Sequence, residues 1–234
     1  MEWSLLDDVT VGRAYLSVWA SRLLRRRFPG ALWAGQPVAP QVALTFDDGP
    51  DPRDTPQLLD VLAQQQVTAT FFELGQRAER WPALVRAVAV AGHQLALHGY
   101  RHRPFPLEAR LALRGQLAYT QRLLAALGGQ ESSAIRDVRP PYGLCTPAGL
   151  IALAAWGYRP VMWSVVPFHW QQSANATIVQ TTRLVRAGSV LVLHESLGGP
   201  AVADLADVIV TRLKAAGFQF VSVDQMWRVH SSAT

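Results

Sequence analysis

Short apolar segments alternate with helix-like segments from residue 42 to residue 223, and this alternation constrains the fold more than any other feature. The apolar segments are continuous, which is typical of parallel strands covered on both faces. The segments between them have helical periodicity, and several end at glycine, as helix C-termini commonly do. About seven β–α units indicate the α/β class, but the alternation alone does not separate a closed barrel from an open sheet. Strands are expected at 42–46, 69–72, 94–97, 137–139, 159–163, 189–193 and 218–223, and helices at 55–66, 77–91, 107–127, 146–156, 176–187 and 203–216.

The composition is that of a folded chain with an excess of positive charge. The 234 residues are 50% hydrophobic and 17% charged, which excludes a largely disordered chain. The formal net charge is +5, and Lys214 is the only lysine. The single cysteine, Cys145, excludes an intrachain disulfide and a thiolate zinc cluster. We find no nucleic-acid-binding motif, so no nucleic-acid partner is expected; the charge reflects either biased composition or an anionic lipid or wall polymer.

Residues 1–40 are predicted to form an N-terminal amphipathic helix and a linker, followed by the main domain at 41–234. The first residues are acidic and the apolar stretch precedes a run of arginines, the reverse of a secretory signal, so no cleavable signal peptide is expected. The helix either packs against the domain or lies on an anionic membrane surface through residues 11–28. No apolar stretch is long enough to span a bilayer. We therefore expect a cytoplasmic or peripheral membrane location.

Polar side chains directly follow four of the expected strands. Asp47 and Asp48 end the first, His98 follows the third, Arg139 ends the fourth and His194 follows the sixth. In α/β barrels the carboxyl ends of the strands meet at one edge, where active sites form. A structural carboxylate or histidine has no reason to prefer one end of each strand, so this placement predicts a functional site.

Asp47, Asp48 and two histidines are candidates for a metal site. Two adjacent carboxylates can serve one site only if the chain turns there, and the Gly-Pro pair that follows supplies a turn. His98 and His102 have the spacing that shares one face of a helical turn. With one aspartate they form a His₂Asp set, typical of catalytic zinc sites that keep one position open. The alternatives are a solvated Asp turn and two unrelated surface histidines.

The remaining strand ends carry groups suited to hydrolysis. Two prolines stiffen the segment RPPYG at 139–143, where Arg139 could hold a carboxylate. The backbone N–H groups of Tyr142 and Gly143 could bind a developing oxyanion. His194 is suited to protonating a leaving nitrogen near neutral pH. The alternatives are a rigid turn with a core tyrosine and a satisfied core histidine, but the set as a whole indicates metal-assisted hydrolysis of an amide or ester.

Four motifs in this order resemble the polysaccharide deacetylase family, the NodB-homology domain of carbohydrate esterase family 4. They are TFDDGP at 45–50, HxxxH at 98–102, RPPYG at 139–143 and LVLH at 191–194. The resemblance covers about residues 41–225. It implies an α/β fold with a distorted, TIM-like (β/α)7 barrel and one divalent metal ion, usually zinc or cobalt. It also implies a hydrolase that cleaves the carbon–nitrogen bond of an N-acetyl group on an amino sugar.

The resemblance implies a catalytic role for four residues, carried over by position. Asp47 is similar to the catalytic base, and Arg139 to the residue that orients this base. Tyr142 would lend its backbone N–H to the oxyanion, and His194 would be the general acid.

The resemblance also implies metal and substrate contacts. Asp48, His98 and His102 match the metal ligands, and zinc is the expected ion, although a His₂Asp set accepts cobalt and other divalent ions. Leu193 would line the pocket for the acetyl methyl group. The expected substrate-binding residues are Pro141, Tyr142, Trp163, Trp170 and Leu193.

The chain departs from the family's pattern at two places. Gly99 stands where serine or threonine often follows the first metal histidine. In the fourth motif Val166 and His169 replace two acids, while the tryptophan is kept. An acid of that motif helps tune the catalytic histidine or its neighbouring arginine. Its loss disfavours the imidazolium form of His194, unless the adjacent Glu195 substitutes.

Three functions fit these features. The first is a metal-dependent deacetylase of an N-acetylated amino-sugar glycan or of a lipid-linked sugar. The second is a related amidohydrolase that acts on a small non-sugar amide. The third is a non-catalytic barrel that binds a glycan or a partner protein through Trp163, Trp170 and the basic N-terminal arm.

Overall fold

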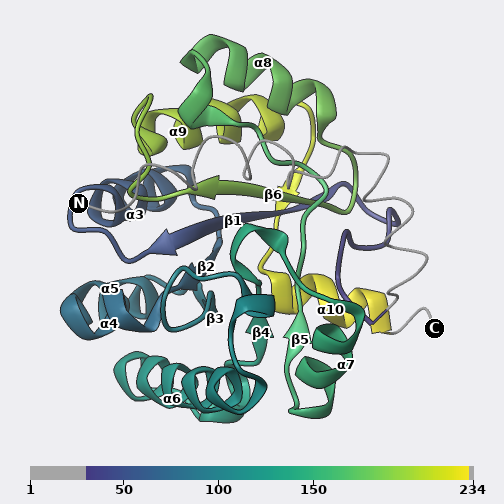
Figure 1. The fold of residues 1–234 in the computed structure, drawn as a ribbon. Helices are drawn as coiled ribbons and strands as arrows, with labels where there is room; N and C mark the ends of the chain where they lie inside the picture. The colour runs from purple at the N-terminus through teal and green to yellow at the C-terminus, as the bar shows by residue number, and fades with distance from the viewer. Residues whose placement is uncertain (1–29, 232–234) are drawn as a thin grey trace.

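A computed structural model describes residues 30–231, which form a curled parallel sheet with helices packed around it (Figure 1). The strands are β1 (Gln41–Gly49), β2 (Thr70–Glu73), β3 (Gln94–Leu97), β4 (Asp137–Val138), β5 (Arg159–Pro160), β6 (Ser189–His194) and β7 (Gln219–Phe220). The helices are α3 (Asp54–Gln65), α4 (Gly75–Arg80), α5 (Pro82–Val90), α6 (Arg110–Gly128), α7 (Pro147–Ala155), α8 (Ala174–Leu184), α9 (Val202–Ala215) and α10 (Val223–Ser231). Short 3₁₀ turns lie at η1 (Phe105–Leu107), η2 (Ser132–Ala134), η3 (Pro141–Gly143) and η4 (His169–Gln171).

The sheet closes on itself through the segment that follows β5. Its strand order is β5-β4-β3-β2-β1-β6, and β7 pairs with the first residues of β1. Val165 forms a parallel bridge with Leu191 of β6, and the N–H of Val192 donates to the Val165 carbonyl at 3.0 Å. Both ends of the strand order therefore meet. The expected α/β class and distorted (β/α)7 barrel are confirmed.

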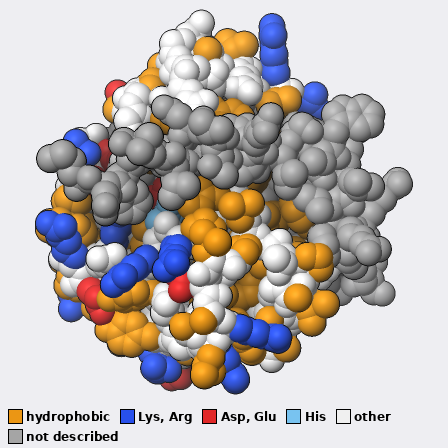
Figure 2. Space-filling model, viewed as in Figure 1, with side chains coloured by type: hydrophobic (Ala, Val, Ile, Leu, Met, Phe, Trp, Pro, Cys, Tyr) orange, Lys and Arg blue, Asp and Glu red, His pale blue; other side chains and the backbone are white. Residues whose placement is uncertain are grey.

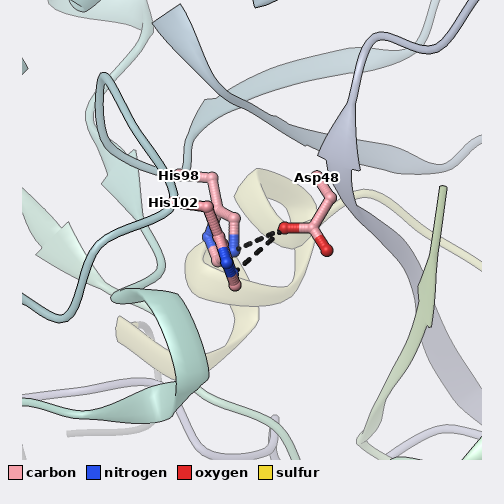
Figure 3. Close-up of side chains that lie close together, drawn as sticks. All are labelled: Asp48, His98 and His102. Atoms are coloured by element: carbon pink, nitrogen blue, oxygen red, sulfur yellow. Dashed lines mark ion pairs between the residues drawn. The ribbon is translucent and has the colours of Figure 1, made fainter. Parts of the chain in front are cut away.

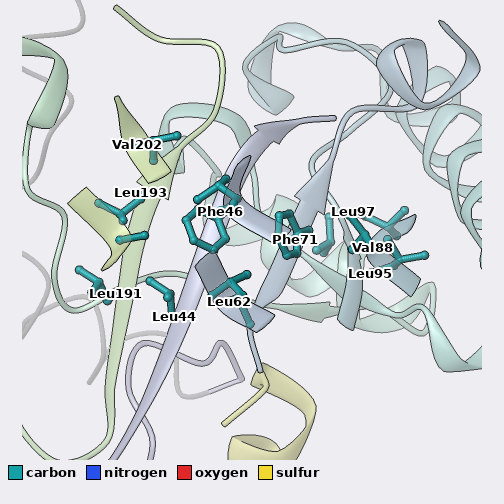
Figure 4. Packing of buried hydrophobic residues seen from close by; sticks show 14 of the residues in the cluster. Leu44, Phe46, Leu62, Phe71, Val88, Leu95, Leu97, Leu191, Leu193 and Val202 are labelled. Atoms are coloured by element: carbon teal, nitrogen blue, oxygen red, sulfur yellow. The ribbon is translucent and has the colours of Figure 1, made fainter. Parts of the chain in front are cut away.

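Alternate residues of the strands build two separate hydrophobic clusters. The larger cluster lies between the sheet and the outer helices, and Figure 4 shows Phe46 and Phe71 at its centre, with ring centroids 5.0 Å apart. The smaller cluster includes Ala43, Phe72 and Val190, one residue from each of three neighbouring strands. Because successive strand side chains point to opposite faces, we place the smaller cluster inside the barrel.

The structure divides one expected helix and adds another. The single helix expected at 77–91 is wrong, because α4 ends at Arg80 and α5 begins at Pro82. Proline has no N–H to continue a helix and is well suited to a first turn. The last expected strand is shorter than predicted, and the chain continues into α10, which the sequence analysis did not predict.

The chain joins the barrel before residue 41. Leu32 is 1% exposed; its N–H donates to the Pro160 carbonyl at 2.9 Å, and its carbonyl accepts from Met162 at 2.7 Å. Residues 1–29, which include most of the expected amphipathic helix, lie outside the described residues. In the part that is described, no helix has the length and apolar character needed to cross a membrane.

Hydrogen bonds and ion pairs connect α10 to the amino ends of the strands. The Arg159 guanidinium donates to both oxygens of Asp137, at 2.8 and 2.7 Å, and to Asp224 of α10 at 2.8 Å. Asp137 is fully buried, and Gln94 also donates to it at 2.6 Å. The opposite edge of the barrel is left for the functional site, as in other α/β barrels.

We predict that Arg159→Met destabilises the protein by about 3 kcal/mol, because it leaves the buried Asp137 carboxylate without its cation. Arg228→Met is the matched control. Its side chain is 78% exposed and pairs with the partly exposed carboxylate of Asp224, so we expect a loss of less than about 1 kcal/mol. Urea denaturation of both variants measures the difference. Equal losses would contradict the importance assigned to the buried pair.

Candidate active site and metal centre

The site begins at the end of β1, where the chain turns. Asp48 has a φ of 72°, a conformation that aspartate tolerates better than most residues. This turn lets two adjacent carboxylates serve one site. Asp47 meets Arg139, whereas Asp48 meets His98 and His102, and both aspartates are buried.

Asp48 and the two histidines converge on one point (Figure 3). Oδ1 of Asp48 lies 3.3 Å from Nε2 of His98 and 3.2 Å from Nε2 of His102. Tetrahedral ligands held about 2.0–2.1 Å from a zinc ion stand about 3.3 Å apart, so the spacing fits such an ion. This buried oxygen forms no hydrogen bond with the described residues. The donor set therefore could hold one divalent cation.

The charges at this point change the protonation of all three groups. Burial opposes ionisation of Asp48, but His102 and His98 hold the pKa of its carboxyl far below the usual range. Burial also disfavours a charged His98, yet Asp47 and Asp48 outweigh it and raise the pKa of this imidazole. Burial lowers the pKa of His102 to about 4. A cation here would meet the Asp48 carboxylate and the neutral imidazole of His102, and it would compete with a proton for Nε2 of His98.

A contact outside this triangle fixes the ring of His98. Nδ1 of His98 lies 2.8 Å from the Arg139 carbonyl, which can only accept, so Nδ1 carries the proton. This leaves Nε2 as the metal-facing atom, the usual arrangement for metal-binding histidines.

The two histidines are not on a helix, so the expectation that they share a helical turn is wrong. Residues 98–104 form an irregular loop, and Gly99 has a φ of 93°. The loop is held on the start of α4, where the N–H groups of Gly75 and Gln76 donate to the carbonyls of Gly99 and Tyr100 at 3.0 and 2.9 Å. The bend brings the His98 and His102 ring centroids to 5.2 Å.

Arg139 is fully buried beside Asp47. Its guanidinium donates to Oδ1 of Asp47 at 2.5 Å, to Oγ1 of Thr45 at 2.8 Å and to the Met162 carbonyl at 3.0 Å. The same group lies 3.9 Å from the ring centroid of Phe72. These contacts fix the orientation of the Asp47 carboxylate.

The segment after Arg139 places an aromatic wall beside His102. Tyr142 has a φ of 58°, and its ring centroid lies 4.3 Å from that of His102. The N–H of Gly143 donates to the Pro140 carbonyl at 2.9 Å, so it is not available to an oxyanion. A Cβ at Gly143 would collide with the ring of Trp163, and therefore only glycine lets this ring pack here.

His194 lies at the end of β6 against two aromatic rings. Trp170 stands edge-on to His194 with centroids 4.8 Å apart, and the His169 ring lies 5.8 Å away. The backbone N–H of His194 donates to Nε2 of His169 at 3.1 Å. Burial lowers the pKa of His169 to about 3 and also lowers that of His194. The neutral imidazole of His169 therefore stands where the resemblance predicts an acid of the fourth motif.

Glu195 does not take over the role of that acid. Its fully buried carboxylate accepts a hydrogen bond from Thr55 and lies against Gly49, on the side of the strand opposite to His194. Glu73 of β2 also approaches Gly49, and a Cβ at residue 49 would collide with both carboxyl groups. Burial raises the pKa of Glu195 to about 8 and that of Glu73 well above its usual range.

The sequence analysis missed Glu73. Its only signal was a carboxylate that ends an otherwise apolar strand.

Two expected substrate-binding residues lie deeper than the others. Pro141 is buried in η3, and Leu193 is fully buried in the larger hydrophobic cluster together with Phe46 and Val202 (Figure 4). Trp163 and Trp170 are only partly buried. The structure thus brings the polar site residues and the two tryptophans together, whereas Leu193 belongs to the core.

Comparisons with known proteins agree with the four motifs. A family model described as polysaccharide deacetylase matches residues 34–161. The chain is 36% identical to the peptidoglycan-N-acetylglucosamine deacetylase of Bacillus cereus over 192 residues, 80% of this chain and 68% of that protein. It is 37% identical to the chitooligosaccharide deacetylase of Sinorhizobium fredii over 158 residues, 67% of this chain and 73% of that protein.

Solved structures show the same fold. The Bc1960 peptidoglycan N-acetylglucosamine deacetylase superposes with a TM-score of 0.79 at 34% identity, over 84% of this chain and 92% of that one. PdaA of Bacillus subtilis, a family 4 carbohydrate esterase, gives a TM-score of 0.78 at 25% identity, over 88% of each chain. Fold, motif order and sequence identity agree, and the chain belongs to the polysaccharide deacetylase family.

Proposed function

We propose that this protein is a metal-dependent hydrolase that removes the N-acetyl group from amino-sugar residues of a glycan or of a lipid-linked sugar. The observation that carries the proposal is the convergence of Asp48, His98 and His102 beside the buried Asp47–Arg139 pair. The relatives named above act on peptidoglycan and chitooligosaccharide, which share the N-acetylated amino sugar.

We assign one divalent ion to Asp48, His98 and His102, and zinc suits this mixed oxygen and nitrogen set best. When bound, such an ion polarises a carbonyl and lowers the pKa of a coordinated water. Cobalt is the second choice, because imidazole and carboxylate ligands accept several divalent ions.

Asp47 is the proposed base. Its carboxylate lies next to the metal-binding residues and is held by Arg139 at 2.5 Å, which keeps one oxygen fixed and leaves the other to accept a proton from the attacking water. Arg139 acts by holding this carboxylate. The buried guanidinium also balances the charge of a second carboxylate placed beside Asp48.

His194 is the proposed acid that protonates the leaving nitrogen, and the backbone N–H of Tyr142 is the proposed oxyanion donor. We assign the sugar to the face lined by Trp163 and Trp170, with Pro141 and Tyr142 beside it. The Leu193 side chain is fully buried, so it can contribute to an acetyl pocket only as part of the core that supports the pocket wall.

Two further assignments rest on the sequence alone. We keep residues 1–40 as an N-terminal helix and linker and residues 41–234 as the catalytic domain. Contact of residues 11–28 with an anionic membrane would bring the site to a lipid-linked substrate.

We expect metal-dependent acetate release from a panel of N-acetylglucosamine oligomers. Metal-stripped protein should release none, and protein reloaded with zinc or cobalt should regain activity. An enzymatic acetate assay with metal analysis measures both. Failure to release acetate from any oligomer, with one equivalent of metal bound, would contradict a glycan substrate of this kind.

Variants of the two adjacent aspartates should differ in metal occupancy and in rate. Asp48→Ala should lower metal occupancy, since it removes one of three ligands. Asp47→Asn should keep the metal and lower kcat about 10²–10⁴-fold, since it removes only the base. Elemental analysis and initial rates test both variants, and an Asp47→Asn protein without metal would refute this division of roles.

His169→Asp should move the alkaline limb of the kcat/KM profile upward by about one pH unit. The general acid must be protonated, so activity is lost as pH rises through the pKa of His194. A carboxylate beside the imidazolium raises that pKa, whereas neutral His169 does not. His169→Asn is the size-matched neutral control and should leave the limb in place; a limb that moves equally in both variants would show that charge at 169 does not act on His194.

A further inference from the structure

A cavity of about 200 Å³ lies between η1, the start of α6 and α7, outside the catalytic residues. Its walls are mainly apolar and include Phe105, Leu113, Leu153 and Trp156. The volume exceeds the roughly 150 Å³ of an apolar cavity that binds benzene. It is therefore large enough to take hydrocarbon.

The apolar surface continues outside the cavity. Leu107, Leu111 and Ile151 are 65%, 82% and 69% exposed, and each is the sequence neighbour of a residue that lines the cavity. Large hydrophobic side chains this exposed, gathered around one hollow, indicate a binding surface. Figure 2 shows hydrophobic side chains interspersed with Lys or Arg side chains over the lower part of the molecule, where Figure 1 places α6 and α7.

Arg110 gives this apolar hollow a positive charge. It lines the cavity with its guanidinium 5.8 Å from the ring centroid of Trp156. Between residues 30 and 231, no carboxylate lies within ion-pair distance of it. The other charged group of the wall, Glu108, is already approached by Arg103 at 3.5 Å and by Gln116 at 3.4 Å. The charge of Arg110 is thus left for a ligand.

The cavity adjoins the loop that carries two of the proposed metal ligands, His98 and His102. Phe105 forms part of its wall, and a ring carbon of Phe105 stands 3.3 Å from the position of a Cβ at Gly99, the residue after His98. Cys145, which also lines the cavity, follows η3 by two residues.

We propose that this cavity binds the hydrocarbon chain of an anionic amphiphile, with Arg110 at its mouth holding a phosphate or carboxylate head group. An apolar hollow with an apolar rim selects the chain, and an unneutralised guanidinium selects the charge. The proposal does not depend on the deacetylase reaction.

Cys145 is the single cysteine of the chain and lines the cavity, so its alkylation reports occupancy. The full-length protein is treated with N-ethylmaleimide alone, with decyl phosphate below its micelle concentration, with decyl maltoside and with inorganic phosphate. We expect decyl phosphate to slow alkylation at least tenfold, decyl maltoside to act only at much higher concentration, and inorganic phosphate to have no effect. Calorimetric titration with decyl phosphate gives the affinity directly.

Two matched pairs of variants locate the ligand. Ala148→Trp places a large ring on an exposed residue of the cavity wall and should abolish decyl phosphate binding, whereas Ala154→Trp, exposed on the same helix but outside the wall, should not. Arg110→Gln should weaken binding about tenfold, and Arg212→Gln on α9 should leave it unchanged. Thermal unfolding confirms that each variant is folded.

Three results would overturn the proposal. The first is no change in Cys145 alkylation or heat with any amphiphile. The second is equal protection by decyl phosphate and decyl maltoside together with an unaffected Arg110→Gln variant, which would leave a purely apolar cavity. The third is equal binding of decyl phosphate by Ala148→Trp and Ala154→Trp, which would place the ligand outside the hollow. None of these results bears on acetate release, so the proposed function would stand.

Discussion

The buried ion pair between Arg139 and Asp47 is the interaction on which the site depends. A guanidinium without access to water needs several acceptors, and Arg139 finds them on β1 and on the segment after β5. Its own carbonyl accepts from Nδ1 of His98, so one residue fixes both the proposed base and a proposed metal ligand. The geometry of the site therefore follows from strand packing, since Arg139 can make these contacts only if β1, β3 and β5 are correctly placed.

The pKa values of carboxyl groups at the same edge of the barrel are shifted in opposite directions. Asp48 is buried, yet two imidazoles keep its pKa low. Burial raises the pKa of Glu195 and of Glu73, and the opposing effect of Arg77 on Glu73 is smaller. The end of β1 thus separates a carboxyl group of lowered pKa, suited to a metal ion, from two carboxyl groups of raised pKa. Gly49 lies at the boundary, because any side chain there would collide with both glutamates.

His169 stands where the resemblance predicts an acid, and this affects the protonation of the neighbouring His194. His169 keeps a structural role, because its Nε2 accepts from the backbone of His194. It cannot supply the negative charge that would stabilise an imidazolium, and burial lowers the pKa of both rings. If His194 is the proton donor, as proposed, its lowered pKa makes it a stronger acid that is protonated only at lower pH.

The sequence by itself determined the α/β class, the family and the identity of the metal and catalytic candidates, because strand periodicity and motif order are local properties. It placed Asp47, Asp48, His98, Arg139 and His194 at strand ends, and the structure gathers them at one edge. Strand periodicity left barrel closure open, and only the resemblance to the family implied it. The irregular loop at 98–104 and the burial of Glu73 beside Glu195 were not predicted. Each of these depends on contacts between residues far apart in the chain: closure on the bridge from Val165 to Leu191, the loop on its hydrogen bonds to α4, and the raised pKa of Glu73 on burial. Only tertiary packing determines which side chains are buried together, and it therefore determines the direction in which their pKa values shift.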